Sequence, residues 1–229
     1  LAAREARLSG HVSVGMAPST ASVLGVPFIN AMRESYPDVR LHLVESLSGN
    51  LERMINTRQL DLAIVFQQEK ILRWSARPVL EERLFLIGTH ALLAPLQEDH
   101  ISPDQLTSLP LIMPSQGHGL RGRLEAVCQQ HHLSVEVVAD IDGLALLMQA
   151  VRSGLGATLQ PGAAISHLDH QALRVIDVVN PILSRPNFLV SLSDDELTPA
   201  GLAARVILSK VMRQLVESDR WPGATLYAH

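Results

Sequence analysis

The sequence has 229 residues, of which 47% are hydrophobic and 18% are charged, with a formal net charge of −4 at pH 7. This length and composition predict an ordered globular protein with one large core or two lobes of about 100 residues each. No uninterrupted apolar stretch of about 18 residues occurs, so no membrane-spanning helix is expected. The negative charge argues against broad nucleic-acid binding by this chain alone. The single cysteine, Cys128, excludes an intramolecular disulfide.

Residues 8–66 are predicted to alternate between strands and helices. Short strands are expected, each of the first two followed by a helix, at 11–17, 39–45 and 59–66. Leu24, Phe28 and Met32 recur at a spacing of four and indicate the core-facing side of the first helix. Pro27 lies inside this segment, so the helix either begins near Pro27 or is kinked there. Two such crossovers predict a parallel sheet, with strand ends and helix N-termini meeting at one edge.

The second part of the chain repeats this pattern. Two extended segments are expected at 77–82 and 83–88. Strands and helices then alternate, with strands at 109–113, 135–139, 156–160 and 187–192 and helices at 120–131 and 143–153. Thr198 and Pro199 are a favoured N-cap and first residue for a last helix.

The expected fold class is therefore α/β, with two Rossmann-like lobes joined by crossover strands. Residues 10–87 and 188–229 are assigned to the first lobe, and residues 88–187 to the second. Residues 1–9 are predicted to be the end of a helix that Ser9 and Gly10 stop. Because the chain starts with leucine, we expect a fragment from which an upstream part has been removed. A small ligand is expected in the cleft between the lobes.

A glycine motif, Gly117-x-Gly119-x-x-Gly122, matches the dinucleotide fingerprint before a helix, and Asp140 and Asp142 lie at the distance expected of a ribose-binding acid. However, three residues separate the glycines from the preceding strand, where a dinucleotide fold needs a tight turn. A loop beside the ligand cleft is the better interpretation.

Catalytic and metal sites have little support in the sequence. The histidine pairs His131–His132 and His167…His170 lack a carboxylate or cysteine at a fixed spacing, so surface histidines are favoured over metal ligands. Cys128 lies among apolar residues and is interpreted as a small buried hydrophobe. No nucleophile elbow and no Walker loop occurs. We predict neither catalytic residues, nor a metal, nor a cofactor.

Hydroxyl-bearing turns are the best candidates for a binding site. Ser19, Thr20 and Ser48 each follow a predicted strand and precede a helix, where backbone N–H groups favour an anion or a carboxylate. Helix capping alone would explain either turn. Two such turns on one sheet edge, facing 114–115 and 160–161 of a second lobe, favour a binding cleft.

The order of these motifs resembles the effector-binding domain of LysR-type transcriptional regulators over about 8–215. The resemblance rests on a Leu-Ser-Gly entry, the small polar turn after the first strand, and five later motifs. These motifs are YPDVRLHLVE, LDLAIVF, VLEERLFLIGTH, LPLIMPS and VRSGLGATLQP. Among subgroups, the sequence looks most like the nitrogen assimilation control and cysteine regulon type.

The resemblance implies a cytoplasmic, dimeric or tetrameric transcription factor whose N-terminal winged helix-turn-helix, the part that binds DNA, is absent here. A small-molecule effector would bind between the lobes and shift the assembly on DNA. The effector contacts carried over are Ser19, Thr20, Ser48, Phe66, Pro114, Ser115 and Gln160. Phe66 departs from members that have an arginine there. That departure puts a dicarboxylate effector in doubt and leaves Arg121 and Arg123 as candidate cations.

Dimerisation in the family would pack the helix at 24–36 of one chain against the helix at 120–131 of the other, with Arg33 near Glu125. A periplasmic-type solute-binding protein shares this hinged fold and is the alternative. An enzyme is the third option, without an acid/base pair to support it.

Overall fold

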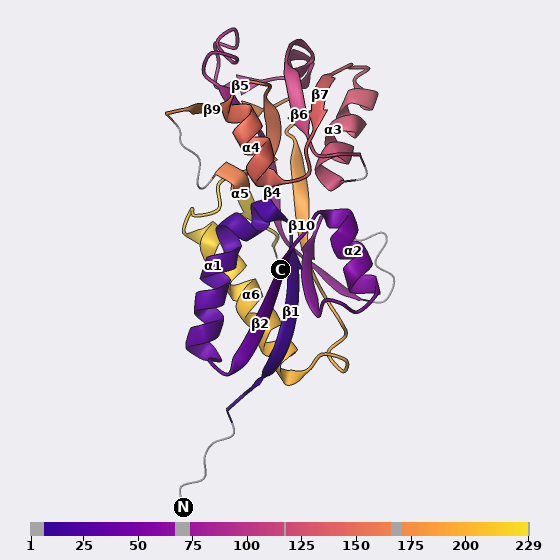
Figure 1. The fold of residues 1–229 in the computed structure, drawn as a ribbon, viewed down its shortest axis with the longest axis vertical. Helices are drawn as coiled ribbons and strands as arrows, with labels where there is room; N and C mark the ends of the chain where they lie inside the picture. The colour runs from indigo at the N-terminus through magenta and orange to yellow at the C-terminus, as the bar shows by residue number, and fades with distance from the viewer. Residues whose placement is uncertain (1–6, 67–73, 117, 166–170, 229) are drawn as a thin grey trace, which may run out of the picture. The chain divides into compact units, whose positions relative to one another are not determined.

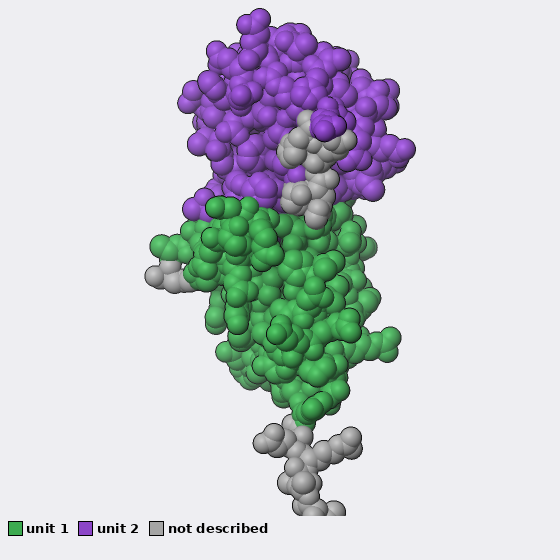
Figure 2. All heavy atoms as spheres, turned by 90° about the vertical axis from the view of Figure 1, so that its left-hand side faces the viewer, with its two compact units in different colours: residues 1–79, 187–220, 226–229 green, residues 80–186, 221–225 purple. Residues whose placement is uncertain are grey.

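The computed structural model describes residues 7–66, 74–116, 118–165 and 171–228. The chain forms two compact units, shown in different colours in Figure 2. Unit 1 comprises residues 1–79, 187–220 and 226–229, and unit 2 comprises residues 80–186 and 221–225. The chain passes from unit 1 to unit 2 within strand β4 (Ser75–Thr89) and returns within strand β10 (Ser184–Ser191). The expected α/β class with crossover strands is confirmed.

Unit 1 is built on a mostly parallel sheet in the order β2-β1-β3-β10. The strands are β1 (Gly10–Met16), β2 (Val39–Glu45) and β3 (Leu62–Val65). β1 pairs in parallel with β2 from Gly10↔Val39 to Met16↔Glu45, and with β3 at Val14↔Leu62. β10 runs antiparallel to β3. β3 is buried along its whole length, as expected of a central strand covered on both faces.

Three helices cover this sheet (Figure 1): α1 (Pro18–Ser35), α2 (Ser48–Asn56) and α6 (Pro199–Glu217). α1 and α6 pack against each other, and α6 also contacts β1. The predicted apolar stripe is confirmed, because Leu24, Phe28 and Met32 are all buried. The alternative that the first helix begins near Pro27 is wrong, since α1 begins nine residues earlier, with Pro18 in its first turn. Pro18 is favoured there because it has no N–H group to leave unpaired.

α6 begins as the sequence predicts. Thr198 is its N-cap and accepts a hydrogen bond at Oγ1 from the Gly201 N–H, at 3.1 Å, and Pro199 follows in the first turn. The N-cap hydroxyl satisfies one of the first N–H groups of the helix, which have no intrahelical acceptor.

Unit 2 contains one sheet around β4 and a second, two-stranded sheet. β4 pairs antiparallel with β8 (Thr158–Pro161) and β9 (Leu173–Val178), and β9 pairs in parallel with β5 (His100–Ile101). β6 (Pro110–Met113) and β7 (Glu136–Asp140) form the parallel pair. The remaining elements are α3 (Gly119–Gln130), α4 (Leu144–Arg152), α5 (Gly162–Ile165), the 3₁₀ helix at Pro103–Ser108 and β11 (Ala224–Leu226).

Unit 2 differs in two ways from the elements predicted for it. The two extended segments expected at 77–82 and 83–88 are one continuous strand, β4, because its successive parts pair with different strands. β5, β9 and β11 were not predicted. Other boundaries differ by one to three residues, which is usual for strand and helix ends.

Apolar side chains from both sheets and from α3 and α4 fill the core of unit 2. Leu84 and Leu86 of β4 share one buried cluster with Leu120 and Leu124 of α3 and with Cys128. Cys128 is therefore the small buried hydrophobe that the sequence predicts. Across the described residues, no helix is long and apolar enough to span a bilayer.

Candidate functional site

The ends of the parallel strands of unit 1 bring four of the predicted site residues to one sheet edge. α1 begins two residues after β1 ends, and α2 begins three residues after β2 ends. A hydrogen bond from the Ser46 N–H to the Met16 carbonyl, at 3.1 Å, joins these two turns. Ser19 and Thr20 on α1 and Ser48 on α2 are all buried here. Phe66, directly after β3, is 5% exposed.

The capping role considered for these hydroxyls is wrong. Ala17 and Leu47 are the N-caps of α1 and α2, with the extended backbone usual at this position, and neither side chain carries an oxygen. Ser19 and Thr20 lie inside the first turn of α1, and Ser48 is the first residue of α2. Both helices therefore begin without a side-chain acceptor at the N-cap.

Thr20 provides the clearest sign of a site at this edge. Its side chain is fully buried, yet within the described part of the chain its Oγ1 has no hydrogen-bond partner. Leaving a buried hydroxyl unpaired costs about 1–3 kcal/mol, so such groups are rare and call for an explanation. A ligand that pairs with this hydroxyl would remove the cost.

The electrostatics of the same edge favour a negatively charged or hydrogen-bond-accepting group. The hydrogen-bond ladder of α1 starts with the Ala21 N–H donating to the Ala17 carbonyl, at 2.8 Å, so earlier N–H groups have no acceptor within the helix. Neither α1 nor α2 has an acidic residue in its first turn. Two helix N-termini whose first turns lack acidic residues present positive ends to the same edge.

In unit 2, the hydrogen-bond donors of the predicted turn at 114–115 already have an acceptor within the chain. Ser115 donates its backbone N–H to Asp142 Oδ1, at 2.8 Å. This backbone bond and a second bond from the Ser115 hydroxyl lower the pKa of the Asp142 carboxyl from its usual value. Asp142 follows β7, on the strand neighbouring β6. The donors of Ser115 therefore hold an anion that belongs to the chain itself.

Gln160 lies within β8, as the strand predicted at 156–160 implies, and its side chain is 4% exposed. Its Nε2 donates a hydrogen bond to Thr158 Oγ1, at 3.3 Å. A parallel bridge joins Leu111 of β6 to Ala157, so Pro114 and Gln160, each three residues further on, lie at the same end of neighbouring strands. The structure therefore groups the unit 2 candidates at one edge.

The two candidate cations differ in availability. Arg121 Nε donates to Glu125 at 2.9 Å, and its Nη1 donates to Asp140 at 2.9 Å and to the Pro114 carbonyl at 3.5 Å. Two of these three acceptors are carboxylates, so the charge of Arg121 is already neutralised within the chain. Arg123 is exposed, and within the described residues it has no ion-pair or hydrogen-bond partner.

The other motifs singled out in the sequence are only partly covered by the described residues. Gly117 and the His167…His170 pair lie outside the described residues. Gly119 and Gly122 belong to α3. The described residues contain no cluster of three or more histidines, cysteines or carboxylates that could hold a metal ion. Sequence reasoning did not identify Asp142 as the acceptor for Ser115, although an aspartate three residues after a predicted strand is a signal for a strand-end turn.

Comparison with known proteins gives the family. Residues 5–213 match the LysR substrate binding domain. The nitrogen assimilation regulatory protein nac of Escherichia coli (strain K12) is 29% identical over 224 residues, which are 93% of this chain and 70% of that protein. This relative is of the subgroup that the sequence most resembles.

Solved structures support the fold. The Synechocystis PCC6803 CcmR regulatory domain in complex with 2-PG superposes with a TM-score of 0.79 at 18% identity, covering 90% of this chain and 99% of that one. The effector binding domain of QuiR in complex with shikimate gives 0.78 at 16% identity, with the same coverage. These neighbours have the expected periplasmic-binding-protein-like architecture. The chain therefore belongs to the LysR substrate-binding domain family, whose matched relatives are transcriptional regulators and not enzymes.

Proposed function

We propose that this chain senses a small-molecule effector for a LysR-type regulator and that the effector contacts the strand-end edge of unit 1. The buried, unpaired hydroxyl of Thr20 carries this proposal, because it lies where two helix N-termini meet. Ser19, Ser48 and Phe66 complete the edge. Phe66 supplies an apolar contact where a cation would be needed to pair a second carboxylate. We therefore expect an effector with one acidic or strongly accepting group and an apolar part.

We further propose that the two units are the lobes expected from the sequence and that Pro114, Ser115 and Gln160 of unit 2 contribute to the same effector site. The relatives support this class of ligand: the CcmR regulatory domain was solved with 2-PG, and the QuiR domain with shikimate. Because Ser115 already pairs with Asp142, we expect its turn to contribute less to effector binding than Gln160 does. The amide of Gln160 is the stronger candidate.

A thermal-shift screen of amino acids, organic acids, inorganic anions and aromatic compounds tests the proposal. A ligand at one hundred times its dissociation constant stabilises the folded state by about 2.7 kcal/mol, which a melting curve detects. The affinity of the best hit is then measured for two variants. Thr20→Val keeps the shape of the side chain but removes the hydroxyl, and Ser48→Leu places a bulky side chain where the effector would bind.

Both variants are expected to weaken binding of the hit by at least about tenfold, the effect of losing one good hydrogen bond or admitting one steric clash. Thr225→Val is the matched control, since Thr225 is exposed in β11. Unchanged affinity in both edge variants, with the wild-type melting profile retained, would refute the assigned site.

DNA binding and assembly are proposed for the full regulator. We propose that DNA is bound by a winged helix-turn-helix outside this chain, that the regulator acts in the cytoplasm, and that it works as a homodimer or homotetramer. A gel shift of this chain with promoter DNA at physiological salt is expected to show no specific retardation. Specific retardation would contradict this division of labour.

The proposed dimer packs α1 of one chain against α3 of a second, with Arg33 near Glu125. Glu125 already accepts hydrogen bonds from Arg121 and Gln116, so Arg33 would add a second cation to this pair. Analytical ultracentrifugation at micromolar concentration should show a dimer that Arg33→Glu weakens. A wild-type chain that sediments only as a monomer would remove this interface.

A further inference from the structure

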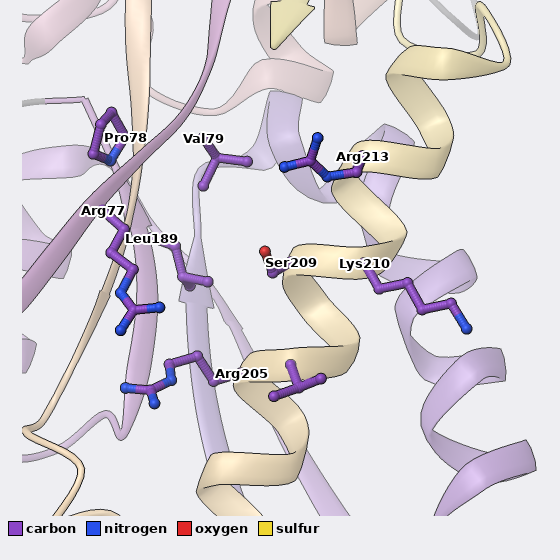
Figure 3. Close-up of a pocket in the computed structure, with 9 residues that line it drawn as sticks. Arg77, Pro78, Val79, Leu189, Arg205, Ser209, Lys210 and Arg213 are labelled. Carbon is purple, nitrogen blue, oxygen red and sulfur yellow. The ribbon is translucent and has the colours of Figure 1, made fainter. Parts of the chain in front are cut away.

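A pocket of about 420 Å³ opens in unit 1 among α6, the start of β4 and β10 (Figure 3). Its lining includes three arginines and one lysine, and no aspartate or glutamate occurs among the nine lining residues. None of these residues belongs to α1 or α2, so the pocket is separate from the proposed effector edge. This concentration of positive charge contrasts with the formal net charge of −4 of the chain.

The spacing of α6 residues explains how the charge is concentrated. Arg205, Ser209 and Arg213 are four residues apart, so they share one face of the helix. In Figure 3 all three project from α6 towards β4 and β10, whereas Lys210 extends away from the pocket. Arg77, from the start of β4, lies across from them.

The cations of the pocket are not equally neutralised. Arg205 Nη2 is 2.6 Å from Asp194 Oδ1, and Arg205 Nη1 donates to Ser191 Oγ at 3.1 Å. Arg77 and Arg213 have no ion-pair or hydrogen-bond partner anywhere in the described chain. The pocket therefore holds two uncompensated guanidinium groups beside one that is fixed and neutralised.

Apolar side chains complete the pocket. Val79 and Leu189 are buried at its base, while Val206 is 63% exposed at its side. An exposed valine between arginines gives the pocket an apolar surface that water solvates poorly. A volume of this size lies in the range of small-molecule sites, which combine apolar walls with a few fixed polar groups.

We infer that this pocket is a second small-molecule site, for a compact dianion with an apolar body. Arg77 and Arg213 each bind an anionic oxygen pair, because guanidinium groups match carboxylates and phosphates in charge and geometry. Two unpaired cations match two negative charges. The apolar body of the ligand packs on Leu189 and Val206. A dicarboxylate and a phosphate monoester share this chemistry.

Isothermal titration of the 229-residue chain at low ionic strength distinguishes a dicarboxylate from a phosphate monoester. The pH is about 8, where phthalate and both phosphate probes are dianions. The probes are phthalate, phenyl phosphate, inorganic phosphate, which lacks the apolar body, and neutral benzamide. Phthalate or phenyl phosphate is expected to bind, at least about tenfold more tightly than inorganic phosphate, and benzamide is not expected to bind.

Arg77→Ala and Arg213→Gln should each weaken the bound probe by about tenfold or more, since each removes a charge-assisted hydrogen bond. Arg40→Ala is the matched control, because Arg40 is exposed on β2 and its loss changes the net charge equally. This control and Thr20→Val should leave the affinity within about twofold. Circular dichroism melts verify that every variant is folded.

Three outcomes of the titrations would overturn the inference. They are no binding of either ring-bearing dianion to the wild-type chain, an equal loss of affinity in Arg40→Ala, and a loss confined to Thr20→Val, which would move the probe to the effector edge. Competition with a duplex DNA of random sequence is the last test. If the DNA displaces the probe and its own binding depends on Arg77 and Arg213, the pocket is a phosphate-backbone contact and the small-molecule site is rejected.

Discussion

The two units carry similar residues in their strand-end turns but satisfy them differently. In unit 1, the Thr20 hydroxyl is fully buried and has no partner among the described residues. In unit 2, Ser115 is held by the carboxylate of Asp142, and Arg121 is held by Glu125 and Asp140. At Ser115 and Arg121, unit 2 supplies its own anions, although His118 Nδ1, just before α3, is also buried without a hydrogen-bond partner among the described residues. A ligand that pairs with the Thr20 hydroxyl therefore gains more than one that approaches Ser115.

The most extensive pairing of buried polar groups in unit 2 surrounds Glu82. Glu82 is fully buried and accepts hydrogen bonds from the Ala163 N–H at 2.9 Å, from Arg185 Nε at 3.0 Å and from Trp221 Nε1 at 2.8 Å. Burial lowers the pKa of the Arg185 guanidinium, and the carboxylate of Glu82 opposes this effect. Each polar group of this network therefore has a partner. Such pairing offsets the cost of removing the charges of Glu82 and Arg185 from water.

Glu82→Ala should change the stability of the chain more than any other substitution proposed for it. The variant leaves the Arg185 guanidinium and the Trp221 indole N–H buried without their acceptor, and we expect the free energy of unfolding to fall by about 3–5 kcal/mol. Urea denaturation followed by Trp fluorescence measures this. Glu196→Ala is the control, since its pair with Arg58 is exposed and should matter little. Equal losses in the two variants would break the contrast.

Thr20→Val should act in the opposite direction. The variant replaces an unpaired buried hydroxyl by a methyl group of similar shape, so the ligand-free chain should become more stable by about 1–3 kcal/mol. Thermal melting without ligand measures the change, and Thr225→Val should leave the melting temperature unaltered. A clear destabilisation by Thr20→Val would indicate that this hydroxyl is already paired in solution.

Asp142→Asn should cost less, and its effect should depend on pH. Because the bonds from Ser115 lower the pKa of Asp142 in the folded state, the carboxylate stabilises the fold above its unfolded pKa. This contribution is lost as the pH falls through the folded pKa. We expect a loss of no more than about 1 kcal/mol near neutral pH, given the exposure of the side chain. The difference between the melting curves of the two proteins should shrink as the pH falls below the ordinary pKa of aspartate, about 3.9.

The smallest effect is expected at Cys128. Its burial, followed by the nearby charge of Glu125, raises the pKa of the thiol, whereas Arg121 lowers it. Thiolate is the reactive form, so iodoacetamide should label the folded chain slowly. Arg121→Gln should slow labelling further, by up to about fivefold, with Arg123→Gln as the control. Faster labelling in Arg121→Gln would contradict the expectation that Arg121 lowers the pKa of this thiol.

Local sequence signals predicted the elements whose stability is local. The spacing of Leu24, Phe28 and Met32 gave the buried face of α1, and Thr198 and Pro199 gave the start of α6. Helix caps and apolar stripes depend on residues a few positions apart, so they can be recognised in the chain. Ser48 was considered as the N-cap of the second helix, but the N-cap is Leu47, one residue earlier. Ser48 is therefore the first residue of α2.

Elements that depend on distant partners were missed or misread. β9 was not predicted, because its residues form a strand by pairing with β4, more than 80 residues earlier. The same long-range pairing joins two predicted segments into the single strand β4. Ser115 looked available in the sequence because its acceptor, Asp142, lies 27 residues away.

The sequence by itself determined the α/β class, the family, and the gathering of hydroxyls at strand ends, because these follow from periodicity and from the order of motifs. Only the tertiary structure decided which of those hydroxyls are satisfied. Thr20 and Ser115 are similar short polar residues near strand ends, but folding brings a carboxylate to Ser115 and none of the described acceptors to Thr20. The pocket at Arg77 and Arg213 arises in the same way, from cations on β4 and α6 that only folding brings together.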